Sequence, residues 1–118
     1  MPIIRILHNP RCSKSRQTLQ LLRDNGIEPQ IIEYLKTPLS ASELSDVFKK
    51  LPMDNIEQMM RPKEAEFRSA GLTKGQVTVE QGLSAMAEYP KLMERPIVIT
   101  DNDARLGRPP ESVLELLS

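Results

Sequence analysis

The residues best suited to chemistry in this chain gather around its one cysteine, Cys12. Cys12 follows a short apolar run and precedes a helical pattern, so it lies at the N-terminus of a predicted helix. Amide groups and the dipole at a helix N-terminus stabilise a thiolate and lower the pKa of a cysteine there. Arg11 and Lys14 add positive charge, and Ser15 adds a hydroxyl donor. Because the same amides attract oxyanions, the segment predicts a nucleophilic thiol beside an anion-binding site.

A structural role is the alternative interpretation of Cys12, because free cysteine is among the most buried residue types. Its polar and cationic neighbours suit a protein core poorly, which favours the reactive thiol. His8, four residues earlier, could pair with the thiolate or tune its charge, or it could be an ordinary histidine bonded to backbone at a strand end. We expect no metal, since one cysteine and one histidine cannot build a closed zinc site.

Three arginines, each directly before a proline, are candidates for binding an anion: Arg61, Arg95 and Arg108. A guanidinium fork binds tetrahedral oxyanions through two parallel hydrogen bonds and stays charged at any relevant pH. The alternative for each is a solvated surface arginine. A cis bond before Pro96 would bring the loop of Arg95 against the loop of Cys12, although the pattern alone does not predict one because cis bonds are rare.

The elements that must position these residues follow from apolar periodicity. Residues 3–7 predict a buried strand, a helix runs from Ser13 to a stop at Asn25-Gly26, and residues 30–34 predict a second strand. Helices are predicted over residues 40–51, 55–60, 62–70 and 79–89. The chain then predicts strands over 96–100 and 104–106, joined by a turn, and a last helix over 111–117.

The order β-α-β, helices, β-β-α predicts an α/β fold with a mixed sheet flanked by helices. The first crossover is long enough for parallel pairing, and the later hairpin is antiparallel. This order matches the thioredoxin-like arrangement. We expect one domain over residues 1–118, with residues 40–90 as a helical insertion within it.

Composition excludes several classes of function. The chain has 118 residues, with 16 Lys plus Arg and 16 Asp plus Glu, so its formal net charge is zero. Neutral charge and a scarcity of aromatic residues argue against nucleic acid as a partner. No apolar run reaches the roughly 20 residues of a membrane helix, and the first residues do not form a signal peptide. We therefore expect no membrane association, a cytoplasmic location and a monomer.

Several segments resemble one known family. They are ILHNPRCSKSR (residues 6–16), NGIEP (25–29), YLKTP (34–38), RPIV (95–98) and LGRP (106–109). Together they resemble the glutaredoxin-coupled arsenate reductases of the thioredoxin-like superfamily, in a short single-cysteine form. The resemblance spans essentially the whole chain, with the motifs in the family's order and spacing.

The resemblance implies a thioredoxin-like fold and a specific reaction. Cys12 would attack arsenate and form a thiol–arsenate adduct. Glutathione would act as co-substrate, with no bound cofactor, and glutaredoxin would resolve the mixed species and release arsenite. The family's remaining site residues fall on six positions, as oxyanion ligands (Arg61, Arg95, Arg108), as groups that favour the thiolate (His8, Ser15) and as a cis proline (Pro96).

Two other functions remain open for a chain of this kind. A related branch with the same fold binds RNA polymerase as a non-catalytic regulator, and its members usually carry Cys-x-x-Cys. Ser15 stands at the second cysteine position here, so a disulfide switch within the motif is impossible. The third possibility is a glutathione-dependent thiol oxidoreductase that acts on another substrate.

Overall fold

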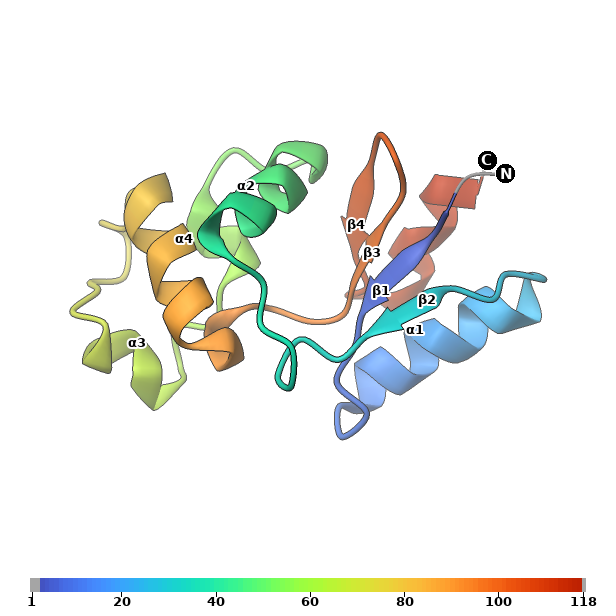
Figure 1. Cartoon of the computed structure of the whole chain (residues 1–118), viewed down its shortest axis with the longest axis horizontal. Coiled ribbons are helices and arrows are strands. Elements are labelled where there is room, and N and C mark those ends of the chain that lie inside the picture. The colour runs from blue at the N-terminus through green and yellow to red at the C-terminus, as the bar shows by residue number, and fades with distance from the viewer. Residues whose placement is uncertain (1–2, 118) are drawn as a thin grey trace.

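The computed structural model describes residues 3–117, and its helices and strands follow the predicted order (Figure 1). The first part contains β1 (Arg5–Leu7), α1 (Ser13–Asp24) and β2 (Gln30–Ile32). The middle part contains α2 (Ala41–Lys50), the 3-10 helix η1 (Ile56–Met59), α3 (Ala65–Ser69), α4 (Val79–Glu88) and η2 (Pro90–Leu92). The last part contains β3 (Ile97–Ile99), β4 (Ala104–Leu106) and η3 (Pro110–Leu117).

The four strands form one mixed sheet in the order β2-β1-β3-β4. β1 pairs with β2 in parallel, and the antiparallel pairs are β1 with β3 and β3 with β4. A parallel pair needs a crossover connection, which α1 provides, whereas β3 and β4 need only a short turn. The predicted α/β fold with a mixed sheet is therefore confirmed.

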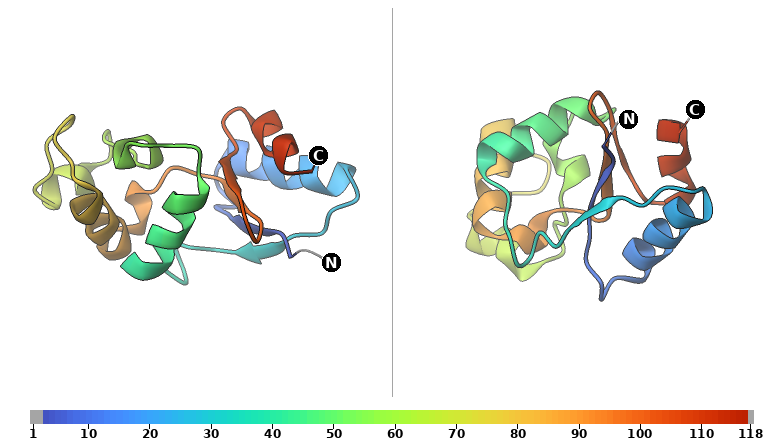
Figure 2. Two further views of the ribbon diagram at one scale, coloured as in Figure 1. Left: turned by 90° about the horizontal axis from the view of Figure 1, so that it is seen from above. Right: turned by 45° about the vertical axis from the view of Figure 1, so that its right-hand side comes forward.

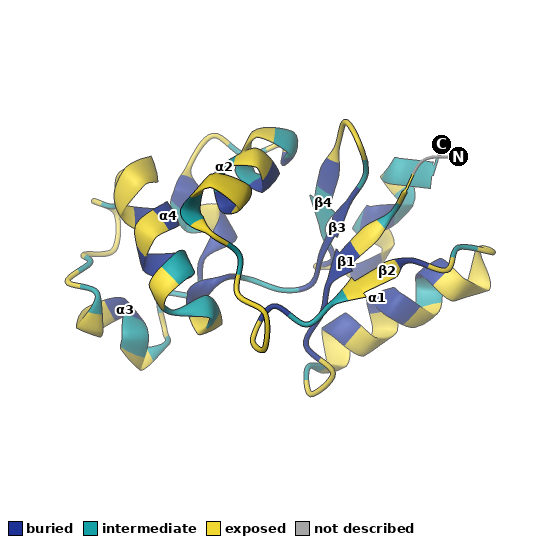
Figure 3. Cartoon of the chain, viewed as in Figure 1, coloured by how far each residue is buried: buried dark blue, intermediate teal, exposed yellow. Residues whose placement is uncertain are grey.

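Different helices cover the two faces of the sheet. Figure 2 shows α1 and η3 on one side and the helices of residues 41–92 on the other. Side chains alternate along a strand, so neighbouring positions enter different clusters. Ile6 and Val98 pack with Leu22 and Val113 from α1 and η3. Leu7 and the flanking positions of β3 belong to the larger cluster, which includes most of the buried side chains of the middle helices. The strands lie between these clusters: β3 is buried throughout, whereas β2, at the edge of the sheet, is mostly exposed (Figure 3).

Local sequence signals start the two longer middle helices. Ser40 caps α2 through a capping box with Glu43, and Thr78 caps α4 in the same way with Gln81. The middle helices pack closely: a Cβ at Gly82 of α4 would lie only 2.7 Å from the side chain of Ile56, so glycine permits the contact. Within residues 3–117 no helix is long and apolar enough to cross a bilayer.

Three strands are shorter than predicted, and β3 covers Ile97–Ile99 rather than residues 96–100, whereas the strand predicted over residues 104–106 is confirmed. The first begins at Arg5 rather than at residue 3, because Arg5 pairs with Ile99, the last residue of β3, after which the chain turns at residues 100–103. The second ends at Ile32 rather than at Tyr34. There the chain turns, with the N–H groups of Lys36 and Thr37 both donating to the carbonyl of Glu33.

Three helical predictions also needed correction. The helix predicted over residues 62–70 covers only Ala65–Ser69, because a turn with a hydrogen bond from Glu64 N–H to the Arg61 carbonyl precedes it. The helices predicted over 55–60 and 111–117 are 3-10 helices, and the second begins at Pro110. Periodicity located these segments but did not distinguish the tighter winding.

Candidate active site

Cys12 occupies the N-cap position of α1, at the carboxyl end of β1. Its N–H donates to the carbonyl of Asn9 (3.0 Å), and its own carbonyl accepts the N–H of Arg16 (3.0 Å), the first bond of the helix. The side chain is partly exposed. The structure thus places the thiol at the positive end of a 12-residue helix, with a route to solvent.

The surroundings of Cys12 favour its thiolate. Burial, the largest influence, acts to raise the pKa of this thiol, but hydrogen bonds from the Ser15 backbone and the Arg95 side chain outweigh it. The charge of Arg95 and the Lys14 N–H act in the same direction, and the pKa of Cys12 is lowered overall. Arg108 also donates from Nη2 to Sγ at 3.6 Å. A thiol held in this way is a candidate nucleophile.

His8, on the loop that leads to Cys12, and Ser15, in the first turn of α1, form a buried pair. His8 Nδ1 lies 2.6 Å from Ser15 Oγ, and the N–H of Asn9 donates to the same oxygen (3.0 Å). Burial, the largest influence, lowers the pKa of His8, which favours the neutral imidazole. The pair fixes the loop at the helix N-terminus, while it is the Ser15 backbone that hydrogen-bonds the thiol.

Arg61 and Arg108 converge on a carboxylate that sequence reasoning missed, that of Glu94. Arg61 Nη1 donates to Glu94 Oε1 (2.7 Å), and Arg108 Nε lies 3.1 Å from the same oxygen. The backbone N–H of Arg95 donates to it as well (3.3 Å). Glu94 therefore ties the three predicted arginine positions together. The only signal in the sequence was its place next to Arg95.

Backbone pairing explains why these distant residues meet. Met60 and Met93 form an antiparallel bridge, flanked by hydrogen bonds from Arg61 N–H to the Leu92 carbonyl (2.7 Å) and from Glu94 N–H to the Met59 carbonyl (2.8 Å). This register sets Arg61 beside Glu94, so that a residue of the middle helices reaches the start of β3.

The loop before β3 and the loop after β4 lie against each other near the thiol. The Arg95-Pro96 and Arg108-Pro109 bonds are both cis. Gly107 N–H donates to the Pro96 carbonyl (2.8 Å), and Arg108 Nε donates to the Arg95 carbonyl (2.7 Å). A Cβ at Gly107 would lie 2.6 Å from Thr18 Oγ1 and 2.8 Å from Pro96 Cγ, so this approach requires glycine.

Arg95 has side-chain N–H donors that remain available to a ligand. Its Nε is buried and has no hydrogen-bond partner among residues 3–117, and no carboxylate in that range forms a salt bridge with it. Arg61, in contrast, is held by both Glu94 and Glu64. A guanidinium that lies beside a thiolate and has no carboxylate partner can bind a tetrahedral oxyanion in position for attack by sulfur. Within residues 3–117 no cluster of three or more His, Cys, Asp or Glu side chains could hold a metal ion.

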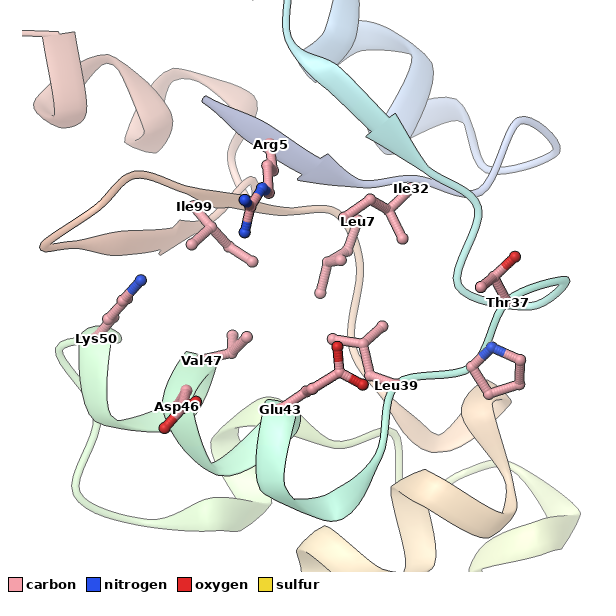
Figure 4. A pocket seen from close by; sticks show the side chains of 11 residues that line it. Arg5, Leu7, Ile32, Thr37, Leu39, Glu43, Asp46, Val47, Lys50 and Ile99 are labelled. Atoms are coloured by element: carbon pink, nitrogen blue, oxygen red, sulfur yellow. The ribbon is translucent and has the colours of Figure 1, made fainter. Parts of the chain in front are cut away.

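A separate groove of about 440 Å³ lies between the sheet and α2 (Figure 4). Leu7, Ile99 and Val47 form part of its apolar lining, with Arg5 and Lys50 among its charged residues. None of the predicted site residues lines it, so the chemistry of Cys12 takes place elsewhere.

Comparison with known proteins agrees with this geometry. The model of the ArsC family matches residues 7–116. Arsenate reductase of Haemophilus influenzae is 46% identical over 112 residues (95% of this chain, 97% of that protein). Protein YfgD of Escherichia coli, named as uncharacterised, is 48% identical over 114 residues (97% and 96%). The solved structure of arsenate reductase from Vibrio cholerae matches with a TM-score of 0.90 and 47% identity, covering 97% of each chain.

These matches confirm the thioredoxin-like fold that the sequence predicted. The family model covers nearly all of the described residues, and the relatives align along almost their whole length. The chain therefore belongs to the ArsC family.

Proposed function

We propose that the protein is an arsenate reductase that uses glutathione as co-substrate and glutaredoxin as its redox partner. One observation carries the proposal: a thiol with a lowered pKa lies at a helix N-terminus next to Arg95, whose guanidinium has no carboxylate partner in the described part of the chain. The names of the relatives from Haemophilus influenzae and Vibrio cholerae support the choice of arsenate among oxyanions.

In the first step, the sulfur of Cys12 attacks arsenic. A sulfur–arsenic bond forms, an arsenic–oxygen bond breaks, and the departing oxygen takes up protons and leaves as water. No electrons are transferred in this step, so the adduct still contains arsenic(V). A thiolate and an arsenate anion repel each other, and Arg95, Arg108 and the helix N-terminus offset this repulsion as charge develops.

Reduction to arsenic(III) requires two electrons, which two thiols supply by forming a disulfide. Cys12 is the single cysteine of the chain, so the chain has no second thiol of its own. Glutathione therefore displaces a second oxygen from arsenic as water and forms a sulfur–arsenic bond. The thiolate of glutaredoxin attacks the glutathione sulfur, so that a glutaredoxin–glutathione disulfide forms and the electron pair of the broken sulfur–arsenic bond stays on arsenic(III). Water then cleaves the bond from Cys12 to arsenic(III), which releases arsenite and restores the thiol. A supply of reduced glutathione suits the cytoplasm, where we place the protein as a monomer.

The test is a coupled assay containing the protein, arsenate, glutathione, glutaredoxin and glutathione reductase, followed by the loss of NADPH. We expect loss that depends on arsenate and disappears in Cys12→Ser. Omission of glutaredoxin alone then tests the redox partner. Thiol exchange by Cys12 without any response to arsenate would contradict the proposal and favour a glutathione-dependent thiol oxidoreductase instead.

A further inference from the structure

Tyr34 carries a polar group that the fold leaves without a partner. Its side chain is 1% exposed, and its hydroxyl is buried and has no hydrogen-bond partner among residues 3–117. Buried polar groups in native proteins are nearly always hydrogen-bonded, because an unpaired group loses its hydration without compensation. An unpaired buried hydroxyl therefore calls for an explanation in terms of function.

The backbone brings Tyr34 to the edge of the sheet where Cys12 lies. Tyr34 is two residues past the end of β2, which runs parallel to β1. The N–H of His8 donates to the carbonyl of Ile32 (2.9 Å), so the chain leaves both strands at the same edge. From there one segment continues to Cys12 and the other turns at residues 33–37, with Tyr34 in the turn.

The charges that act most strongly on the hydroxyl all belong to the candidate site. In order, they are those of Arg95, Cys12, Arg61 and Glu94. Burial is the main cause that raises the pKa of Tyr34 to about 12. The hydroxyl therefore keeps its proton at any pH used for an assay and can act as a hydrogen-bond donor.

The cavity that Tyr34 lines offers no other polar side chain. Tyr34 also lines a small cavity of about 10 Å³, whose other lining residues are all apolar (Leu39, Leu44, Met86, Pro90, Met93). A buried water needs two to four polar partners, which these side chains do not supply. Met93 in this lining directly precedes Glu94 and Arg95, so the cavity and the site share one segment.

We propose that the Tyr34 hydroxyl donates a hydrogen bond to an oxygen of the oxyanion held between Cys12 and Arg95. The inference rests on the proposed function and adds to it a neutral donor that the arginines do not supply. The unpaired hydroxyl gains its partner when the tetrahedral anion binds. Tyr34 is thus a substrate-binding residue that destabilises the free protein slightly and stabilises the complex.

Tyr34→Phe separates these two effects, because it removes only the oxygen and keeps the buried ring. We expect the variant to melt at the same temperature as the wild type or a higher one, since an unpaired polar atom is lost. Its kcat/KM for arsenate should fall by about 10- to 100-fold, as expected for a hydrogen bond to a charged group. Tyr89→Phe, which alters the other tyrosine of the chain, is the matched control and should leave both quantities unchanged.

Binding of inorganic phosphate and arsenate to Cys12→Ser, measured by calorimetry, tests the donor without turnover. Adding Tyr34→Phe to this background should raise the dissociation constants of both anions by about 10- to 100-fold. An inactive wild type with Tyr34-dependent anion binding would refute arsenate reduction but support the donor. Three results would overturn the inference. The first is equal anion binding with and without the hydroxyl, and the second is a lower melting temperature of Tyr34→Phe with unchanged kcat/KM. The third is no anion binding in any variant.

Discussion

Replacing Arg95 by alanine removes a guanidinium that no carboxylate of residues 3–117 neutralises. Its Nε is buried without a partner, so the substitution should change the stability of the free protein little and weaken the binding of an anion strongly. Loss of one donor to a developing oxyanion costs about 2–4 kcal/mol, or roughly 30- to 1000-fold in kcat/KM. We expect Arg95→Ala to fall in this range in the coupled assay.

The same variant has a second readout that needs no arsenate. Arg95 lowers the pKa of Cys12 by a hydrogen bond and by its charge, so its removal must raise that pKa. The pH midpoint for alkylation of Cys12 by iodoacetamide should therefore move upward. Arg11→Ala is the control, since Arg11 is an exposed cation next to Cys12 that is not among the groups shifting the pKa of the thiol.

Arg61 and Arg95 differ in how many guanidinium donors remain free to bind an anion. Arg61 already gives Nε and Nη1 to Glu64 and Glu94, so fewer of its five N–H donors remain for an anion. Arg61→Ala should therefore reduce kcat/KM less than Arg95→Ala. If Arg95→Ala keeps both the wild-type alkylation profile and the wild-type kcat/KM, the assignment of Arg95 is wrong.

Three further substitutions test other parts of the site. Arg95→Lys should keep the alkylation midpoint near that of the wild type but not restore full kcat/KM, because an ammonium group lacks the bidentate fork. Glu94→Gln should destabilise the fold by about 1–3 kcal/mol in urea denaturation, since it weakens charge-assisted bonds to Arg61 and Arg108. An unchanged urea midpoint would contradict the bridging role of Glu94. Gly107→Ala should cost about 1–3 kcal/mol of stability, because its Cβ would meet backbone-anchored neighbours at 2.6–2.8 Å, and an unchanged urea midpoint would count against this close packing.

The sequence predicted the part of the site that one local segment builds. The apolar run ending at Leu7 and the helical pattern from Ser13 placed Cys12 at the junction, and the structure has α1 beginning at Ser13. Such patterns depend on residues three or four positions apart, so they can be recognised in the sequence without knowledge of the fold. The extents of short elements were less predictable, as in the strand that ends at Ile32, because the turns that follow decide where pairing stops.

The identity of the carboxylate that organises the arginines could not be read from periodicity. Arg61 and Glu94 lie 33 positions apart, and Arg108 and Cys12 lie 96 apart. The arginines stood out because each directly precedes a proline, and the resemblance to a family assigned them to one site, whereas nothing marked Glu94 as their common partner.

The sequence by itself determined the order of elements, the cysteine at a helix N-terminus and the absence of a second thiol. Only the tertiary structure decided that Arg61 and Arg108 share Glu94, that Arg95 keeps unpaired donors and that the Tyr34 hydroxyl is buried without a partner. The physical reason is the range of the interactions. Periodicity and capping act within a few residues, whereas the bridge between Met60 and Met93 and the packing of the cis-proline loops depend on which distant surfaces meet.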